Sequence, residues 1–506
     1  MGVQERLLGG RLSRASSSDV MFEGPFADDK RVAMASDSVV ARLAALHQIL
    51  GGYVTEGPLR VGVLSNHRVE TYVSVLAASS FGATFVPLNP KFPVERLRTI
   101  IELSTPHVIF GDRSTLDVHA SVAPQVPFID VAQVDPAPQL VEGWARHLAD
   151  SSVDVGSVAY VMFTSGSTGT PKGVPVSYGN LCSYVDGISQ LIDFPNETRW
   201  TQFFDLSFDL SIHDIFVSHR CGGTLVAPTQ IDLMMPGAYV ARERIDVWFS
   251  VPVLGAQLGN GKPKEGFAGM AQMLFCGEAL PVETVDACRP WLSSTGRMWN
   301  LYGPTEATIA FTAADVTESS RTAGNASIGT AFGVNHTALR GEAGEITHEP
   351  TIGSEGELLL GGPQVFAGYS TDAPSPFVES NGERFYRSGD LVRVDDEGIY
   401  FRGRVDSQVK FRGYRIELGE IESAARRVFN LKTVAVVVFG SHTDAKLVIF
   451  YLAGEAGDVA LDPRKLESIL PKYMVPSEFI PLDSMPTNQN GKIDRRRLVA
   501  DHGGNR

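Results

Sequence analysis

The chain has 506 residues, more than a single compact core usually holds, so two or more domains are expected. Its 44 Lys and Arg residues against 58 Asp and Glu residues give a net charge of −14, which argues against nucleic acid or an anionic membrane as the main partner. It contains no apolar run near the roughly 18–20 residues of a membrane span, no secretory signal, and four cysteines without metal-ligand spacing, so a cytoplasmic location without a zinc site is expected.

Helical and strand-like patterns alternate through the first part of the chain, after a polar lead-in of about 30 residues that we expect to be irregular. Such alternation predicts a parallel sheet covered by helices. The expected helices are 37–50, 69–81, 93–103 and 180–192, and the expected strands are 59–64, 83–88, 108–111, 158–163, 224–227, 247–253, 272–276 and 298–301.

The pattern changes twice toward the C-terminus. Closely spaced turns from Gly356 onward predict a β-rich subdomain, and beyond residue 405 a small α+β unit follows. Its expected strands are 408–411, 433–439 and 445–452, and its expected helices are 417–428 and 463–470. The fold class is therefore α/β, with a large N-terminal domain (1–405) and a small C-terminal domain (406–506).

The stretch Tyr160–Gly173, YVMFTSGSTGTPKG, places a Gly- and hydroxyl-rich loop directly after an apolar strand. Glycines let the backbone approach a bulky anion, hydroxyls donate hydrogen bonds, and a lysine supplies positive charge, so the loop suits a polyphosphate. A flexible surface turn is the alternative. The ordinary P-loop order is not met, because the lysine precedes Gly173. The candidate phosphate residues are Thr164, Ser165, Gly166, Ser167, Thr168, Gly169 and Lys172.

The loop FTSGSTGTPKG resembles the phosphate loop of the adenylate-forming superfamily, which contains acyl-CoA synthetases, luciferases and peptide-synthetase adenylation domains. Further segments match that family in the same order: FGATFVPLNPKFPVERL, FCGEALP, YGPTEAT, YRSGD, GRVDSQVKFRGYRIEL and PTNQNGKIDR. The resemblance implies attack of a substrate carboxylate on the α-phosphorus of ATP, with Mg²⁺ and a lysine offsetting the negative charge.

The resemblance also implies roles for single residues. Glu306 is expected to bind the metal and Thr305 to contact the α-phosphate, although YGPTE alone is also compatible with a simple turn. Asp390 is expected to accept the ribose hydroxyls, although an isolated SGD more often caps a helix or forms an Asx turn. Phe401 stands where relatives often have tyrosine. The nucleotide set comprises Gly277, Glu278, Ala279, Asn300, Tyr302, Gly303, Asp390, Phe401 and Arg404, with Tyr302 expected to stack on adenine.

Two residues of the small domain match motifs of the family. Lys492 resembles the lysine that completes the site during adenylation; a lone lysine in a polar loop would otherwise be read as solvated. Asp406 matches the hinge about which the small domain turns between adenylation and transfer.

Asp209 in SFDLS is the residue most informative about the substrate. In amino-acid-activating relatives an aspartate here pairs with the α-ammonium group, and a carboxylate beside an apolar pocket needs such a cation; the alternative is a helix N-cap. The pocket walls carried over from the family are Leu210, His213, Phe249, Leu274, Cys276, Leu301, Ile309 and Ala310. These walls resemble both prolyl-activating enzymes and D-alanyl carrier-protein ligases, and packing is favoured for His213, which fits neither.

The acceptor implied by the resemblance is the phosphopantetheine thiol of a separate carrier protein, because no fused carrier module follows the last motif. The expected activity is thus a ligase of nonribosomal peptide synthesis and secondary metabolism that activates a small, mostly apolar amino acid as aminoacyl-AMP. An acyl-CoA synthetase using CoA and a non-catalytic ATP-binding protein stay open as alternatives.

Overall fold

The computed structural model describes residues 3–8, 19–26, 30–54, 56–64, 66–150, 153–166, 171–318, 324–440, 444–455, 461–487 and 493–503. The chain divides by its internal contacts into two compact units. The first comprises Met1–Pro90, Ile101–Met162 and Gly173–Val405; the second comprises Lys91–Ile100, Phe163–Lys172 and Asp406–Arg506.

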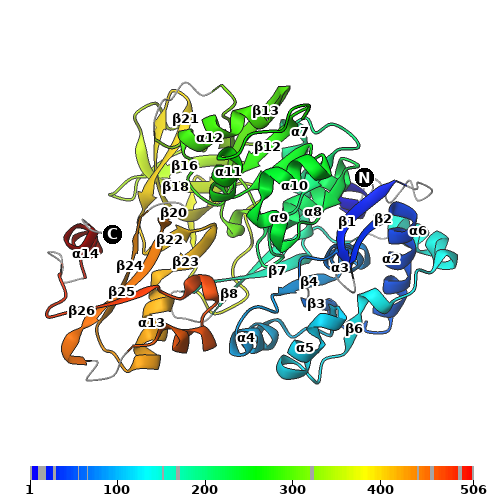
Figure 1. Ribbon diagram of the computed structural model, residues 1–506, viewed down its shortest axis with the longest axis horizontal. Coiled ribbons are helices and arrows are strands. Elements are labelled where there is room, and N and C mark those ends of the chain that lie inside the picture. Colours follow the sequence, from blue (N-terminus) through cyan, green and yellow to red (C-terminus); the bar gives the residue numbers. More distant parts are fainter. Residues whose placement is uncertain are drawn as a thin grey trace. The chain divides into compact units, whose positions relative to one another are not determined.

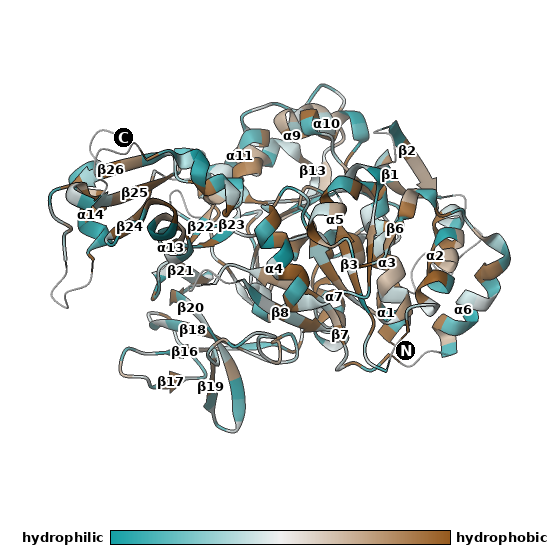
Figure 2. Cartoon of the chain, turned by 90° about the horizontal axis from the view of Figure 1, so that it is seen from below, coloured by the Kyte–Doolittle hydropathy of each residue, from teal (hydrophilic) through white to brown (hydrophobic). Residues whose placement is uncertain are grey.

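A six-stranded sheet follows the alternation predicted from the sequence. Its strand order is β6-β5-β3-β4-β7-β8, and the four pairs from β6 to β7 are parallel. Figure 1 labels these strands except β5, and Figure 2 shows β3 mainly brown while α4 carries both colours, as an amphipathic helix does. The bounds are β3 Arg60–Leu64, β4 Thr84–Leu88, β5 Val108–Gly111, β6 Phe128–Asp130, β7 Val158–Thr164, β8 Lys172–Ser177, α2 Ser36–Gly51, α3 Val69–Phe81, α4 Val94–Ser104, α5 Leu116–Val122 and α6 Val141–Asp150.

A nine-stranded sheet has the order β15-β14-β13-β12-β11-β9-β10-β1-β2. Helix α3 contacts β1 of this sheet as well as β3, β4 and β5 of the six-stranded sheet, so it lies between the two and is buried almost all round. The strands are β1 Val20–Phe26, β2 Lys30–Ala35, β9 Arg199–Thr201, β10 Thr224–Val226, β11 Val247–Ser250, β12 Met270–Phe275, β13 Leu292–Tyr302, β14 Thr312–Asp315 and β15 Thr330–Ala331. The helices that follow β8 are α7 Tyr178–Leu191, α8 Leu210–Arg220, α9 Gln230–Met234, α10 Pro236–Glu243, α11 Pro252–Gly259 and α12 Val282–Cys288.

Two expectations about this unit are wrong. The first 30 residues are not simply an irregular lead-in, because helix α1, Val3–Leu8, packs against α7 and α8 and β1 is paired inside the sheet. The strand expected over 247–253 ends at Ser250, since Pro252 starts α11. Proline is well suited to the first turn of a helix and cannot continue a sheet ladder.

The β-rich section predicted after Gly356 is confirmed as a six-stranded sheet, which begins earlier, at β16. Its strands are β16 His336–Arg340, β17 Ile346–Thr347, β18 Glu355–Gly361, β19 Phe377–Ser380, β20 Glu383–Asp395 and β21 Gly398–Arg404.

The C-terminal part of the second unit contains helices and strands in the predicted α+β order. Strand β22 (Gln408–Phe411) pairs with β23 (Tyr414–Glu417), and helix α13 (Leu418–Phe429) precedes a sheet of order β24-β25-β26. The helix expected over 463–470 is a 3₁₀-helix, Pro463–Ser468, rather than an α-helix. The remaining bounds are β24 Val434–Phe439, β25 Lys446–Leu452, β26 Glu478–Leu482 and α14 Arg495–His502.

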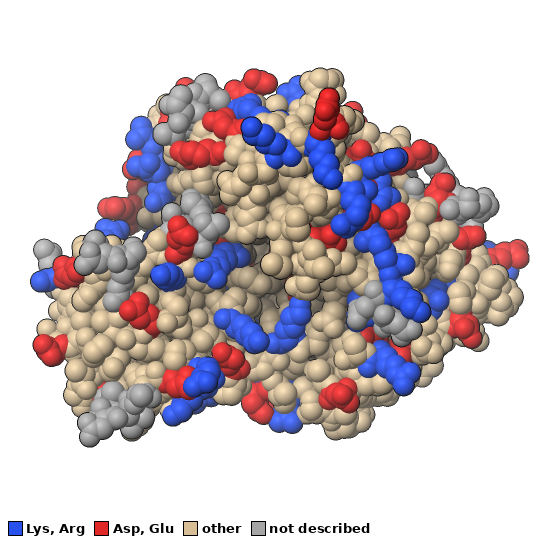
Figure 3. Space-filling model, in the orientation of Figure 1, with Lys and Arg blue, Asp and Glu red and all other residues tan. Residues whose placement is uncertain are grey.

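The surface that Figure 3 shows has acidic and basic side chains interspersed, so the net charge of −14 does not form one acidic patch on that face. Within the described ranges, no helix is both long enough and apolar enough to cross a bilayer.

Candidate active site

Three predicted nucleotide residues meet around one carboxylate. Asp390 on β20 lies directly opposite Arg404 on β21 in the antiparallel register, and Arg404 donates to its Oδ1. The hydroxyl of Tyr302, at the end of β13, donates to Asp390 Oδ2 at 2.5 Å. Asp390 is only 3% exposed, so its carboxylate is stabilised by the ion pair with Arg404 rather than by water. The cap or Asx-turn alternative for SGD does not describe this carboxylate.

Glu306 lies in a 3₁₀ turn, Thr305–Ala307, that follows the same strand β13. Its carboxylate is buried, and the Tyr369 hydroxyl donates to Oε1 at 2.8 Å. A Cβ on Gly303 would come within 2.7 Å of the Ala310 backbone, so the tight return of this loop requires glycine. A single buried carboxylate fits Mg²⁺, which commonly takes one or two carboxylates together with substrate phosphates. No group of three or more potential metal ligands occurs among the described residues.

The neighbouring strand ends carry the remaining nucleotide residues. Gly277, with φ +94°, follows β12 and leads into Glu278 and Ala279. Asn300 on β13 lies beside Phe275 of β12; its Nδ2 donates to the Ser327 carbonyl at 2.7 Å. Asn300 Oδ1 is buried and has no hydrogen-bond partner in the part of the chain that the structure describes, so it is a candidate acceptor for a ligand.

The predicted pocket walls other than His213 pack in one hydrophobic cluster. Side chains alternate between the faces of a strand, and the two faces here belong to different hydrophobic clusters. On β11 and β12, Trp248, Met273 and Phe275 pack in the second cluster. The walls Leu210, Phe249, Leu274, Cys276, Leu301, Ile309 and Ala310 all belong to the first.

Asp209 precedes helix α8 but its side chain makes no capping hydrogen bond, so the N-cap alternative does not hold. The residue is 8% exposed. His213 lies one turn further along the same helix face and is fully buried. Its Nδ1 shares a hydrogen bond of 2.6 Å with the Tyr184 hydroxyl, and its ring lies 4.5 Å from that of Phe249. Burial lowers the pKa of His213 to about 3, which keeps it neutral and agrees with a packing role.

The phosphate loop and the small-domain residues are described only in part. Ser167, Thr168, Gly169 and Lys492 lie outside the described residues. Thr164 ends β7, and Ser165 donates to the Arg415 carbonyl at 3.1 Å within the second unit. Lys172 begins β8, Phe401 is half-buried on β21, and Asp406 is the exposed residue at which the chain passes from the first unit to the second.

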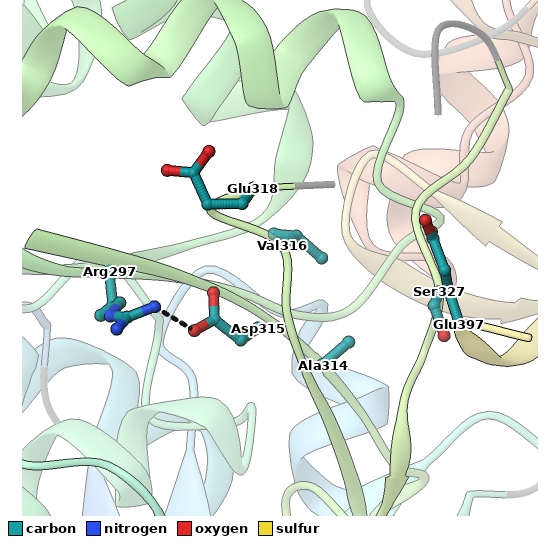
Figure 4. A pocket seen from close by; sticks show the side chains of 7 residues that line it. All are labelled: Arg297, Ala314, Asp315, Val316, Glu318, Ser327 and Glu397. Atoms are coloured by element: carbon teal, nitrogen blue, oxygen red, sulfur yellow. Dashed lines mark hydrogen bonds and ion pairs between the residues drawn. The ribbon is translucent and has the colours of Figure 1, made fainter. Parts of the chain in front are cut away.

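A separate hollow of about 250 Å³ lies beside β13 and the end of β14 (Figure 4), where Arg297 pairs with Asp315 at 3.0 Å. It contains none of the predicted nucleotide or substrate residues. Its lining is Arg297, Ala314, Asp315, Val316, Glu318, Ser327 and Glu397.

The hydrogen-bond partners of the predicted residues could not be read from the sequence. Tyr369 and Tyr184 were not singled out, although they contact Glu306 and His213 respectively. The available signal was a tyrosine two positions after a Phe-Ala pair in GGPQVFAGY, but only folding brings it to Glu306.

Comparison with known proteins identifies the family of this chain. The family model described as AMP-binding enzyme matches residues 40–370. The L-proline–[L-prolyl-carrier protein] ligase of Streptomyces coelicolor is 33% identical over 492 residues, which covers 92% of this chain and 90% of the relative. The D-alanine–D-alanyl carrier protein ligase of Lactiplantibacillus plantarum is 30% identical over 459 residues, covering 87% and 88%.

The fold comparison gives the same family. The Vibrio cholerae adenylation domain AlmE, solved in complex with glycyl-adenosine-5′-phosphate, superposes with a TM-score of 0.86 at 26% identity and covers 99% of this chain and 97% of that chain. Because the family model spans well over half of the sequence and the relatives match along nearly their whole length, this chain belongs to the AMP-binding enzyme family, as a ligase.

Proposed function

We propose that this enzyme activates a small, mostly apolar amino acid with ATP and transfers it to the phosphopantetheine thiol of a separate carrier protein. In the first step a carboxylate oxygen bonds to the α-phosphorus and the bond to pyrophosphate breaks, giving aminoacyl-AMP. In the second step the thiol sulfur attacks the acyl carbon, AMP leaves, and the thiol proton passes to solvent.

The observation that carries the proposal is the buried carboxylate of Asp209, which does not cap its helix and directly precedes the predicted pocket wall Leu210 at the start of α8. A buried carboxylate is costly unless a cation answers it, and the α-ammonium group of an amino acid is such a cation. Fatty and aromatic acids lack that group. The ligase names of the relatives, for L-proline and D-alanine, support an amino acid of that size.

The nucleotide end of the proposal uses the Asp390 cluster and Glu306. Asp390 would hold the ribose with Arg404, Tyr302 would pack on the base, and Thr305 would contact the α-phosphate. Glu306 would hold Mg²⁺, which when bound neutralises phosphate charge. Lys492 is proposed, on its motif alone, as the lysine that offsets the remaining negative charge during adenylation.

Amino-acid-dependent exchange of pyrophosphate into ATP tests the proposal. We expect exchange with proline, alanine or glycine and none with fatty or aryl acids. Asp209→Asn is expected to raise the amino acid KM at least 100-fold, since it removes a buried charge pair. The matched control is Asp205→Asn, four residues earlier, whose carboxylate accepts from the Ser207 backbone and hydroxyl.

Three results would count against the proposal. Exchange that no amino acid stimulates favours a non-catalytic ATP-binding protein. Transfer to CoA but not to a phosphopantetheinylated carrier favours an acyl-CoA synthetase. An equal rise in KM in both aspartate variants would show that Asp209 does not recognise the ammonium group.

A further inference from the structure

The loop that carries Glu306 has a backbone conformation that its residues disfavour. Residues 303–311 connect the antiparallel strands β13 and β14, and within them Thr308 and Ile309 have φ values of +59° and +71°. Left-handed backbone is a genuine outlier for β-branched side chains, and such conformations persist only where the surroundings hold them. Glu306 and the pocket wall Ile309 therefore depend on whatever holds this loop.

The side chain of Gln364 makes that contact. Gln364 is fully buried, and its Nε2 faces three carbonyl oxygens of the loop, those of Ala310 at 2.8 Å, Ala307 at 3.2 Å and Thr308 at 3.3 Å. The Thr308 hydroxyl donates in return to the Gln364 carbonyl at 2.6 Å. The Gln364 side chain thus forms hydrogen bonds with backbone carbonyls before and after Ile309, the second of the two left-handed residues.

The orientation of the Gln364 amide is fixed by Asn335. Asn335 Nδ2 donates to the Phe332 carbonyl at 2.9 Å and to Gln364 Oε1 at 2.6 Å. Since Asn335 presents a donor, the Gln364 atom that faces it must be the oxygen, and the amide nitrogen must face the three carbonyls. The reversed amide would place four oxygens together.

The segment around Gln364, residues 362–370, also contacts Glu306 directly. The Phe366 backbone N–H donates to the Glu306 carbonyl at 2.9 Å, and the Tyr369 hydroxyl donates to its carboxylate. The segment is itself held to the core, because Asn180 on α7 donates to the Pro363 carbonyl at 2.6 Å and Ser370 N–H donates to the Gly173 carbonyl at 2.9 Å.

We propose that Gln364 is a positioning residue, which through the carbonyls of residues 307, 308 and 310 fixes the left-handed turn and thereby the Glu306 carboxylate and the Ile309 wall. Through its amide, Gln364 contacts only backbone carbonyls of the loop, including that of the predicted wall Ala310, and no hydrogen bond joins it to the Glu306 carboxylate among the described contacts. The expected effect of Gln364 on pyrophosphate exchange rests on the proposed function, whereas its effect on the conformation of residues 303–311 does not.

Gln364→Met tests the inference, because methionine has a similar length and no amide. The matched control is Gln4→Met, which removes a buried amide that donates to the Ser80 carbonyl on a distant helix. By hydrogen exchange with mass spectrometry, we expect amides of residues 303–311 to exchange at least tenfold faster in Gln364→Met and unchanged in Gln4→Met. Thr308→Val keeps the β-branch and loses only the hydrogen bond of the hydroxyl, so we expect amides of residues 303–311 to exchange at least threefold faster. This variant tests the inference if Gln364→Met does not fold.

The second measurement is the Mg²⁺ dependence of pyrophosphate exchange. We expect the half-maximal Mg²⁺ concentration to rise at least tenfold in Gln364→Met and to stay at the wild-type value in Gln4→Met. The inference is overturned if amides of residues 303–311 exchange at the wild-type rate in the Gln364 and Thr308 variants. It is also overturned if the faster exchange is spread evenly over the first unit. If the wild-type enzyme shows no amino-acid-dependent exchange, the proposed function fails, while the hydrogen-exchange result still decides the role of Gln364.

Discussion

The carboxyl group of Asp214, on helix α8, is expected to make the stability of the first unit depend on pH. Asp214 is 0% exposed, and neither of its oxygens has a hydrogen-bond partner among the described residues. Burial raises its pKa well above the ordinary value, because the charged form loses its hydration. The adjacent His213 supplies no cation, since burial keeps it neutral. The folded chain therefore retains a proton that the unfolded chain releases.

The size of the effect follows from proton linkage. Between the unfolded pKa of about 3.9 and the raised pKa of the folded state, the folded state binds one more proton, so the free energy of unfolding falls as pH rises. The slope is about 1.4 kcal/mol per pH unit while the folded state keeps the proton, which gives up to about 4 kcal/mol between pH 5 and pH 8. Asparagine has the same shape and does not titrate. The advantage of Asp214→Asn over wild type should therefore grow with pH.

Urea unfolding at pH 5, 6, 7 and 8 measures this difference. All five tryptophans lie in the first unit, so their fluorescence follows the unit that contains Asp214. The control is Asp396→Asn, the same substitution at an exposed aspartate of the same unit. A constant difference between Asp214→Asn and wild type over these three pH units would refute the reasoning, because it would mean that Asp214 carries the same proton in both states.

Three further predictions concern the second unit. Lys492→Ala should cripple aminoacyl-AMP formation and leave transfer from preformed adenylate largely intact; equal loss of both in single-turnover assays would contradict its role. Asp406→Pro, which fixes φ at the junction of the units, should permit pyrophosphate exchange and block thioester formation, so normal thioester output would rule out a hinge there. Arg96→Met leaves the buried Glu420 carboxylate without its cation and should destabilise the second unit by roughly 3–5 kcal/mol in calorimetry; a loss below about 1 kcal/mol would contradict this.

Elements whose signals are local were predictable. Helix α3 has the bounds expected from its apolar pattern, and Gly82, with φ +79°, ends it as a left-handed C-cap. The strand expected over 247–253 was too long because a short apolar run does not distinguish a strand from the helix that follows it. Helix α1 has only six residues, too few to show a period. It is held by tertiary contacts such as the donation from Gln4 to the Ser80 carbonyl.

The candidate site divides in the same way. Glu306 and Asp390 could be proposed from the sequence because each stands in a short continuous motif, YGPTEAT and YRSGD. Gln364 was not found, because its importance depends on three carbonyls more than fifty residues away in sequence. A polar residue inside an apolar run, as in PQVFAGY, indicates only that a partner exists and does not say which one.

The pairing of Asp390 with Arg404 and Tyr302 bears on how a nucleotide could bind there. An ionised carboxylate has about four acceptor positions, and the two partners use one on each oxygen. One position on each oxygen is left, which matches the two hydroxyl donors of a ribose. The contacts that stabilise this buried carboxylate therefore also orient its remaining lone pairs. Under the proposed function, a nucleotide would bind to a carboxylate that is already oriented, so little reorganisation would be required when it arrives.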